Sequence, residues 1–494
     1  MAPTVLLAVA IGSMMGIIVG VLPGIGPGVA IAVLLPLTYG MTPLAGISVL
    51  LGIYCGAFYG GAVTSILIRT PGEASSIMTM FDGYPMARRG EAERALSIAF
   101  MSSFIGGMFS AITIALMAPW LARFTGRFGA TEFAATSALA LLCVAKAYKG
   151  QFAVSMMMLG LGLFLGTVGI DQTSSEHRYT FGMTAMLTGV PLVPVIIGLF
   201  GIAQAMVLLA TPPTTEQPPS IKAGINFRAF LEPFRYPTTL SKSVLLGTGI
   251  GILPAVGAAL STSLAYFEAR RASREPESFG KGSPEGIVAA EAANNSNSGG
   301  AMGTVLTLGI PGDAVTAIIM GVFIVHGIYP GPQLFTDKPE LAYGIFGSLI
   351  TINLVILGLL ILTTRYLVRF VNVQARVLGV IILALCFIGA YSVGTSLYGV
   401  LIALVFGVFG WACAWLRIPV IPLALGLVMG DFLEASLRQT LNISNGSWLI
   451  FFERPIAACI VGLGFLILIW PLVRMFRPSA QTPSSERPGP GGAQ

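Results

Sequence analysis

Long apolar segments joined by short polar loops make up most of the chain. Residues 96–118, 151–170, 342–362 and 456–472 are examples of such segments. A helix of about 20 apolar residues crosses the roughly 30 Å hydrocarbon core of a membrane, and each of these segments is of that length. The pattern therefore predicts an all-α polytopic membrane protein with about 11–12 spans.

Two of the apolar segments are interrupted by a Pro-Gly pair followed by an acidic residue. The first reads GGAVTSILIRTPGEASSIMTMFDGYPM (60–86), and the second reads GGAMGTVLTLGIPGDAVTAIIMGVF (299–323). Non-helical backbone at membrane depth is tolerated only where it is buried in protein or lines a wet cavity. We therefore expect broken helices in both places, and we expect the functional centre to lie at the breaks.

Four sequence matches in the same order indicate an internal duplication. GVLPGIGPGVAI (20–31) matches GIGILPAVGAAL (249–260), and the segment 44–84 matches 286–330. WLARF and PLVPVIIGL in the first half match YLVRF and PVIPLALGL in the second. The predicted organisation is a first membrane repeat at 1–210, a cytoplasmic linker at 211–242, a second membrane repeat at 243–440, an additional C-terminal span at 441–476 and a disordered tail at 477–494.

The first apolar stretch, 5–40, is itself interrupted by LPGIGPG. It is either a long kinked helix or, as we favour, a re-entrant hairpin with Pro23, Gly24, Gly26 and Gly28 at its tip and Pro254 and Gly257 at the matching tip of the second half. With two hairpins and a periplasmic N-terminus, most loop lysines and arginines fall on the cytoplasmic side, together with the C-terminus. This topology predicts two inverted-topology repeats, the architecture of secondary transporters.

Composition and charge narrow the function. The chain has 494 residues, 55% hydrophobic and 10% charged, with a net charge of +6, whereas soluble proteins carry about 25% charged residues. The modest positive charge is typical of cytoplasmic loops and gives no support to nucleic-acid binding. The sequence contains no GxxxxGK[ST], HExxH or DDxxD pattern, so we expect no ATP hydrolysis and no enzymatic activity.

The breaks suit a small anion such as a carboxylate. A helix that starts inside the membrane presents unpaired N–H groups and about half a positive charge, and nearby amides and hydroxyls can donate hydrogen bonds. The alternative is that these small polar residues pack helices tightly together. The candidate substrate-binding residues are Arg69, Thr70, Pro71, Gly72, Ser75, Ser76, Asn294, Asn295, Ser296, Asn297, Ser298, Gly312 and Thr316.

Two acids, Glu73 and Asp313, follow the breaks. They either bind a coupling proton or Na⁺ or cap the helix that follows, and we group them as ion-coupling candidates with Thr64, Thr304 and Thr307. Arg69 either binds a substrate carboxylate or neutralises Glu73. No cofactor is expected beyond H⁺ or Na⁺, and Na⁺ at the broken helices is the metal ion that the pattern suggests.

The same motifs resemble one family, the TctA large membrane subunit of tripartite tricarboxylate transporters. The resemblance rests on GVLPGIGPGVAIAVLLPLTYGMTP (20–43), on residues 52–96 and on AEAANNSNSGGAMGTVLTLGIPGDAVTAI (290–318). It implies a permease in the bacterial inner membrane that imports tricarboxylates or other small carboxylates, driven by a proton or sodium gradient. It also implies two partners, a small four-helix TctB-like membrane subunit and a periplasmic TctC-like solute-binding protein. The rival classes are a carboxylate-selective channel and an intramembrane enzyme acting on lipid-linked substrates.

The inverted arrangement predicts opposite accessibility of the two hairpin tips. In Gly26→Cys and Gly257→Cys variants, a membrane-impermeant thiol reagent should label one tip from the periplasmic side and the other from the cytoplasmic side. Labelling is measured on intact cells and on inside-out vesicles. Reaction of both cysteines from the same side would contradict the inverted repeat.

Overall fold

The computed structural model describes residues 2–22, 25–126, 128–148, 150–171, 175–211, 224–253, 257–367, 373–393 and 395–475. These residues are mostly helical, and β1 (Gly169–Ile170) and β2 (His177–Arg178) form a short antiparallel sheet. Eight helices in this part of the chain are long and apolar enough to cross a membrane, and shorter apolar helices accompany them. The predicted class, an all-α polytopic membrane protein, is confirmed.

Many helices begin at a proline, whose missing N–H is not needed in the first helical turn. Pro3, Pro27 and Pro43 occupy this position in the first half, and Pro237 and Pro284 do so in the second. The first-half helices are α1 (Pro3–Val21), α2 (Pro27–Leu34), α3 (Pro43–Ile68), α4 (Ile77–Arg88), α5 (Ala92–Thr125), α6 (Ala130–Ala147), α7 (Phe152–Gly166), α8 (Leu192–Ile196) and α9 (Ala203–Ala210), with the short helices η2 (Ala74–Ser76) before α4 and η4 (Ile197–Ile202) before α9.

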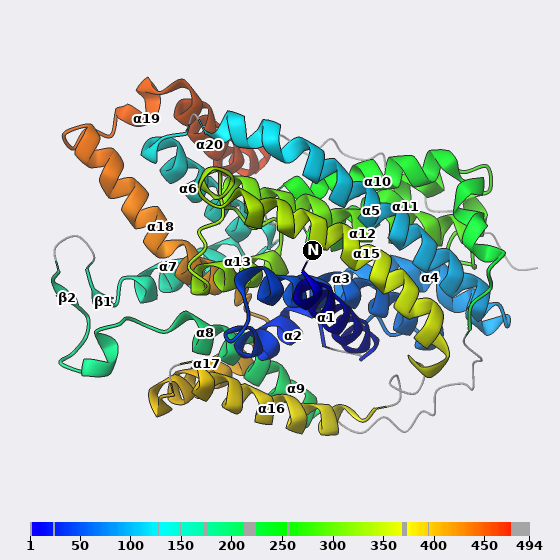
Figure 1. Cartoon of the computed structure of the whole chain (residues 1–494). Coiled ribbons are helices and arrows are strands. Elements are labelled where there is room, and N and C mark those ends of the chain that lie inside the picture. The colour runs from blue at the N-terminus through cyan, green and yellow to red at the C-terminus, as the bar shows by residue number, and fades with distance from the viewer. Residues whose placement is uncertain are drawn as a thin grey trace, which may run out of the picture.

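The second half follows the same order. Its helices are α10 (Pro237–Ile252), α11 (Gly257–Ala272), α12 (Pro284–Leu308), α13 (Ala314–Val325), α14 (Gln333–Asp337), α15 (Pro339–Leu367), α16 (Ala375–Ser392), α17 (Leu397–Trp415), α18 (Ile421–Ile443), α19 (Ile450–Glu453) and α20 (Pro455–Met475). The pairs α1 and α10, α3 and α12, and α4 and α13 occupy matching places in the duplicated sequence. Figure 1 shows α1, α3 and α12 near the middle of the molecule and α10, α11 and α4 toward one end.

Close backbone packing joins α1 to α3. The helices meet through glycines, namely Gly12, Gly16 and Gly20 of α1 and Gly52, Gly56 and Gly60 of α3. Gly12 lies against Val49 and Gly20 against Ala57, so the two helices run parallel. A β-carbon on Gly56 would lie 2.7 Å from the carbonyl oxygen of Ser13. Small residues allow this approach, and no larger residue fits without moving backbone.

The second half repeats this pair in α10 and α12. Gly247 lies against Ala293 and Ser296, and Gly251 lies against Asn297 and Gly300. Each half is therefore built on one tightly packed pair of parallel helices.

The stretch before α3 folds as a helical hairpin. After α1 and α2, the short helix η1 (Leu35–Thr38) brings Thr38 back to α3, where a β-carbon on Gly46 would lie 3.1 Å from the β-carbon of Thr38. Gly46 is one turn before the residue that faces Gly12, so the chain has returned toward the start of α1. A long kinked helix would have carried Thr38 away from that level. Of the expected tip residues, Pro23, Gly24 and Pro254 lie outside the described residues.

Helices of each half pack on helices of the other half, and the packing is reciprocal. In one direction α12 packs on α5, with Gly299 against Ser110; in the other α3 packs on α15, with the Ser48 and Ser348 hydroxyls 2.8 Å apart. The same holds for later helices of each half: α18 of the second half packs on α7 of the first, and η4 and α9 of the first half pack on α17 of the second. This pattern accords with a duplication, while the repeat boundaries and their orientation in the membrane stay predictions. The start of the predicted linker (212–223) and the predicted tail lie outside the described residues.

The tight α1–α3 contact should make Gly56 intolerant of a single methyl group. Gly56→Ala places a β-carbon against the backbone of α1, and such overpacking typically costs about 1–3 kcal/mol. We expect a lower midpoint of thermal unfolding in detergent. Gly160→Ala is the matched control, because Gly160 is exposed on α7 and has nothing within 4 Å of an added β-carbon. Equal midpoints for the two variants would contradict the proposed packing.

Candidate functional site

Both Pro-Gly breaks are reversals of the chain. After α3 ends, Arg69 adopts a left-handed conformation with φ 55°, and after α12 ends, Gly309 does so with φ 69°. The chain then turns back, so that Gly72 lies against Gly61 and Gly312 lies against Ala301. The half-helices α4 and α13 therefore start beside α3 and α12. The sequence predicted a helix broken in two; the structure places the second piece alongside the first.

The reversals depend on glycine. A β-carbon on Gly72 would lie 2.7 Å from the Cα of Gly61, and one on Gly312 would lie 2.7 Å from the Cα of Ala301 and 2.6 Å from the carbonyl oxygen of Gly251. Because these neighbours are backbone atoms of packed helices, a side chain at either position would push the loop out of its place.

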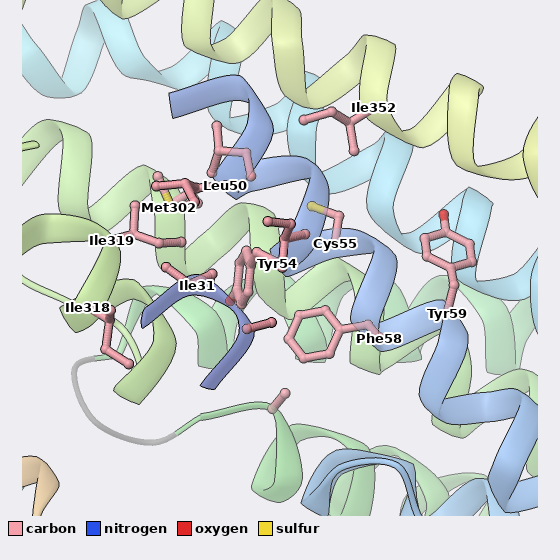
Figure 2. Close-up of a cluster of buried hydrophobic side chains, with 14 of the residues drawn as sticks. Ile31, Leu50, Tyr54, Cys55, Phe58, Tyr59, Met302, Ile318, Ile319 and Ile352 are labelled. Atoms are coloured by element: carbon pink, nitrogen blue, oxygen red, sulfur yellow. The ribbon is translucent and has the colours of Figure 1, made fainter. Parts of the chain in front are cut away.

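Asp313 caps α13 and is held by the other half of the protein. Its carboxylate accepts hydrogen bonds from the backbone N–H of Thr316 at 2.7 Å and from the Thr316 hydroxyl at 2.8 Å. The Tyr54 hydroxyl, which comes from α3, donates to the same carboxylate at 2.7 Å. Figure 2 shows Tyr54 on α3 in the cluster that also contains Ile31 of α2 and Ile319 of α13.

The first break is built differently. Glu73 makes no capping hydrogen bond to the helix that follows, and the Ser75 hydroxyl donates to its carboxylate. No side chain caps the start of α4. The Ser76 hydroxyl is fully buried and has no hydrogen-bond partner in the protein, while Thr64 donates to the carbonyl oxygen of Gly61 at 3.1 Å. The first break thus leaves the Ser76 hydroxyl without a partner and the start of α4 without a side-chain cap.

Arg69 and Thr70 face away from the buried region around the two breaks, which we call the centre. Both are exposed, and the Arg69 guanidinium lies over the ring of Tyr84 at 5.8 Å from the ring centre. No ion pair joins Arg69 to Glu73 in the described part of the chain. Pro71 is half-buried in the reversal loop.

The polar run of α12 is entirely buried and divides into two groups. Ser296 and Ser298 donate to carbonyl oxygens of their own helix, as Thr304 and Thr307 do further along. The amides of Asn295 and Asn297 reach the carbonyl oxygens of Glu291 and Gly247 only at 3.5 Å. Unpartnered atoms are the Oδ1 of Asn297 and both the Oδ1 and the Nδ2 of Asn294.

The place of Asn294 in the duplicated sequence suggests what it faces. Asn294 aligns with Tyr54, and Tyr54 reaches Asp313, the acid after the break in the other half. By the same relation we expect Asn294 to face Glu73. The asparagine is shorter than the tyrosine and, unlike it, makes no hydrogen bond in the protein.

Sequence reasoning missed Glu291. This residue is fully buried on α12, where the Thr79 hydroxyl donates to its Oε1 and the Ser103 hydroxyl donates to its Oε2 at 2.7 Å. An acid inside the apolar run GIVAAEAANN was the available signal, because acids in membrane segments are rare and usually functional.

Three carboxylates therefore share the centre. Glu73 precedes η2 and Asp313 precedes α13, while Glu291 of α12 is bonded to Thr79 of α4. None of the ion pairs formed by the described residues includes Glu73, Glu291 or Asp313. Unpaired buried charge is costly, so these acids are the candidates in this part of the chain for binding a proton or a cation.

Residues of both helical hairpins pack beside the breaks. Gly257, with φ 72°, begins α11 next to Asp313, whose β-carbon is 3.9 Å from the place of a Gly257 β-carbon. Gly28 lies against Ile318 of α13, and Gly26 has open space around it. The second arm of each hairpin packs on the half-helix of the other repeat, α2 on α13 and α11 on η2 and α4.

Two cavities lie at opposite ends of α12. One, of 860 Å³, includes Gly309 at the second break and is lined by α7, α13, α18 and the β1–β2 hairpin, which projects from one side of the molecule in Figure 1. Arg178 and Arg438 line it and pair with Glu434 at 2.9 Å and 2.7 Å. The other, of 700 Å³, is bounded by α10, α11 and the first residues of α12. Neither cavity is lined by Glu73, Asp313 or Asn294.

Comparison with known proteins gives one family. Residues 6–425 match the model of the tripartite tricarboxylate transporter TctA family. The chain is 36% identical over 448 residues to an uncharacterized 52.8 kDa protein of the TAR-I ttuC' 3'region of Agrobacterium vitis, covering 90% of this chain and 89% of that protein. It is 35% identical over 231 residues to an uncharacterized protein of the TAR-II ttuC' 3'region of the same organism, covering 47% of this chain and 96% of that protein. No solved structure matches.

The contact between the halves should contribute measurably to stability. Tyr54→Phe removes the hydroxyl donor to Asp313, and hydrogen bonds to charged groups are worth about 1.5–3 kcal/mol. We expect a lower midpoint of thermal unfolding in detergent. Tyr39→Phe is the control, because the buried Tyr39 hydroxyl has no partner and its removal should leave stability unchanged or raised. Similar losses in both variants would show that the contact with Asp313 contributes nothing specific.

Proposed function

Because the chain belongs to the tripartite tricarboxylate transporter TctA family, we propose that it is the permease subunit of a binding-protein-dependent secondary transporter for tricarboxylates or other small carboxylates. Family membership makes it a multi-pass membrane component of a transporter with further subunits, and the resemblance seen in the motifs is confirmed. The proposal adds import across the bacterial inner membrane, a periplasmic N-terminus and a proton or sodium gradient as the driving force. It also adds a TctB-like membrane subunit and a TctC-like periplasmic binding protein as partners.

The unpartnered polar groups beside the first break carry the proposal. Buried polar atoms almost always have a hydrogen-bond partner, yet both side-chain atoms of Asn294 and the hydroxyl of Ser76 have none. Beside them the N-terminus of α4 has no side-chain cap. An amide, a hydroxyl and a helix N-terminus are groups that bind a carboxylate without a fixed positive charge, which permits release. The substrate site proposed here therefore centres on Asn294 and Ser76, with Arg69 outside it.

The negative charge of two carboxylates is the reason for proposing a coupling ion. Glu73 and Asp313 flank the proposed site, and neither is part of an ion pair among the described residues. A carboxylate entering this centre would be repelled by both acids. Protons or sodium ions that neutralise them remove the repulsion, so anion and cation binding favour one another. Such mutual dependence is what a symporter requires.

The positions of the two cavities support alternating access. One cavity reaches the second break, and the other lies at the opposite end of α12. Movement of the half-helices and hairpins against the tightly packed pairs would open the site to one cavity at a time, as in transporters built from repeats. A carboxylate-selective channel would instead hold both paths open together.

Reconstituted transport tests this function. The chain and its small membrane subunit are placed in liposomes with the binding protein outside, and uptake of radiolabelled citrate is measured under a proton or a sodium gradient. We expect saturable accumulation that requires one gradient and the binding protein. Passive equilibration that does not saturate would favour the channel.

An asparagine comparison links the uptake to the site. Asn294→Ala should reduce substrate affinity about ten- to a hundredfold, the effect of losing a charge-assisted hydrogen bond of about 1.5–3 kcal/mol. It should leave the unfolding midpoint unchanged, because Asn294 bonds to no protein group. Asn353→Ala is the control: Asn353 accepts from Tyr59 at 2.9 Å and donates to Leu349 at 2.9 Å, so stability should fall. Unchanged affinity in Asn294→Ala would remove that residue from the site.

A further inference from the structure

Glu291 is the most deeply buried acid of the centre. It has no exposed surface, whereas Glu73 and Asp313 are each partly exposed. Each of its carboxylate oxygens accepts one hydrogen bond, from Thr79 of α4 and from Ser103 of α5. No lysine, arginine or histidine of the described residues forms an ion pair with it. The structure thus holds this carboxyl group in a fixed orientation but gives it no counter-charge.

Two hydroxyl bonds do not compensate a buried charge. The cost of burying an isolated carboxylate is large, and proteins usually avoid it by pairing or by protonation. A metal ion of the hard type would need several oxygen lone pairs directed at it, but here the hydroxyl hydrogens point at the carboxylate oxygens. The geometry is that of a group which takes up and releases a proton.

A row of polar side chains lies between Glu291 and the first break. Ser76 and Thr79 are three residues apart on one helical segment and therefore lie on the same face. Ser76 lies near Gly61 and has no partner, while Thr79 donates to Glu291. Glu73 lies just before Ser76, at the start of η2, which packs on α12. The Ser76 hydroxyl bonds to neither neighbour, so the row places polar groups between the two acids without joining them in one hydrogen-bonded path.

We propose that Glu291 is the proton-binding residue of this transporter and that its protonation is what couples carboxylate movement to a proton gradient. The inference rests on the proposed function and deepens it by choosing the coupling ion and the group that carries it. One proton adds to a carboxylate oxygen of Glu291, forming a neutral carboxylic acid, and the same O–H bond breaks on release. No other bond changes.

The other titratable groups near Glu291 have surroundings that differ from its own. Glu73 belongs to the first break, whose helix η2 packs on α12, and the hydroxyl of Tyr59 on α3 donates to Asn353 at 2.9 Å. Asp82, one turn beyond Thr79 on α4, is occupied by the Tyr266 hydroxyl of α11 at 2.8 Å and by the N–H groups of Gly280, Gly282 and Ser283. The Asp82 carboxylate is thus bonded mainly by backbone N–H groups, whose direction is fixed. Among the described residues, the Glu291 carboxylate is bonded only by two hydroxyl groups, which can rotate and can either donate or accept.

A matched substitution separates the proton site from a structural role. Glu291→Gln imitates the protonated acid and keeps hydrogen-bonding partners for Thr79 and Ser103. Glu132→Gln is the control, because Glu132 is also buried but pairs with Arg454 at 2.7 Å. Infrared difference spectra of the full-length protein in lipid, recorded across a pH titration, report protonated carboxyl groups without any substrate. We expect Glu291→Gln to remove a titrating carboxylic-acid band that remains in Glu132→Gln.

Transport provides the second readout in the same proteoliposomes. Glu291→Gln should retain exchange of internal for external citrate, which needs only the substrate site, and should lose proton-driven accumulation to the level of empty liposomes. Glu291→Asp should recover part of the accumulation. Proton-driven accumulation by Glu291→Gln at the wild-type level, or an unchanged infrared band, would overturn the proposal, as would wild-type uptake driven by sodium alone.

The two proposals fail in different ways. If wild-type protein neither exchanges nor accumulates citrate, the carboxylate function as tested fails, and the infrared titration still decides whether Glu291 binds a proton. If exchange and accumulation are present but Glu291→Gln alters neither, the transporter stands and the assignment of Glu291 falls.

Discussion

Backbone that leaves helical geometry inside a membrane must find its partners within the protein, because lipid offers none. The two reversal loops of this chain meet that requirement by lying against packed helices. Gly72 rests on Gly61 of α3 and on the end of α1, and Gly312 rests on Ala301 of α12 and on the end of α10. The glycine contacts between α1 and α3, and between α10 and α12, create the flat surfaces on which the loops lie. The position of Glu73 and Asp313 follows from this packing.

Duplication produced two similar breaks that do different things. Asp313 is engaged by Thr316 and by Tyr54, so the start of α13 is already capped. At the first break the start of α4 has no side-chain cap and Ser76 has no partner. The exchange of tyrosine for asparagine between the matching positions 54 and 294 accompanies this difference. The second break is thus held by contacts between the halves, and the first break has polar groups without partners, which is why the proposed substrate site lies there.

The charge of the centre connects structure to transport. Glu73, Asp313 and Glu291 gather where no described basic side chain pairs with them, while the basic residues that do form ion pairs, such as Arg178 and Arg438, line an outer cavity. A site that is negative when empty favours the joint arrival of anion and cation over either alone. This electrostatic asymmetry is the basis of the proposed coupling between carboxylate and cation.

The helical membrane class, the place of both breaks and the family could be predicted from the residues alone, because apolar length and Pro-Gly interruptions are local signals, while the internal duplication stays a prediction. It also pointed to the polar run of α12. The tertiary structure alone decided that the breaks fold back, that Arg69 faces outward, that Tyr54 holds Asp313 and that Thr79 and Ser103 hold Glu291. Tyr54 and Asp313 are 259 residues apart, and Thr79 and Ser103 are 212 and 188 residues from Glu291. No local pattern encodes which helices approach closely over such separations. Helix packing across the two halves sets these contacts, so only the folded chain reveals them.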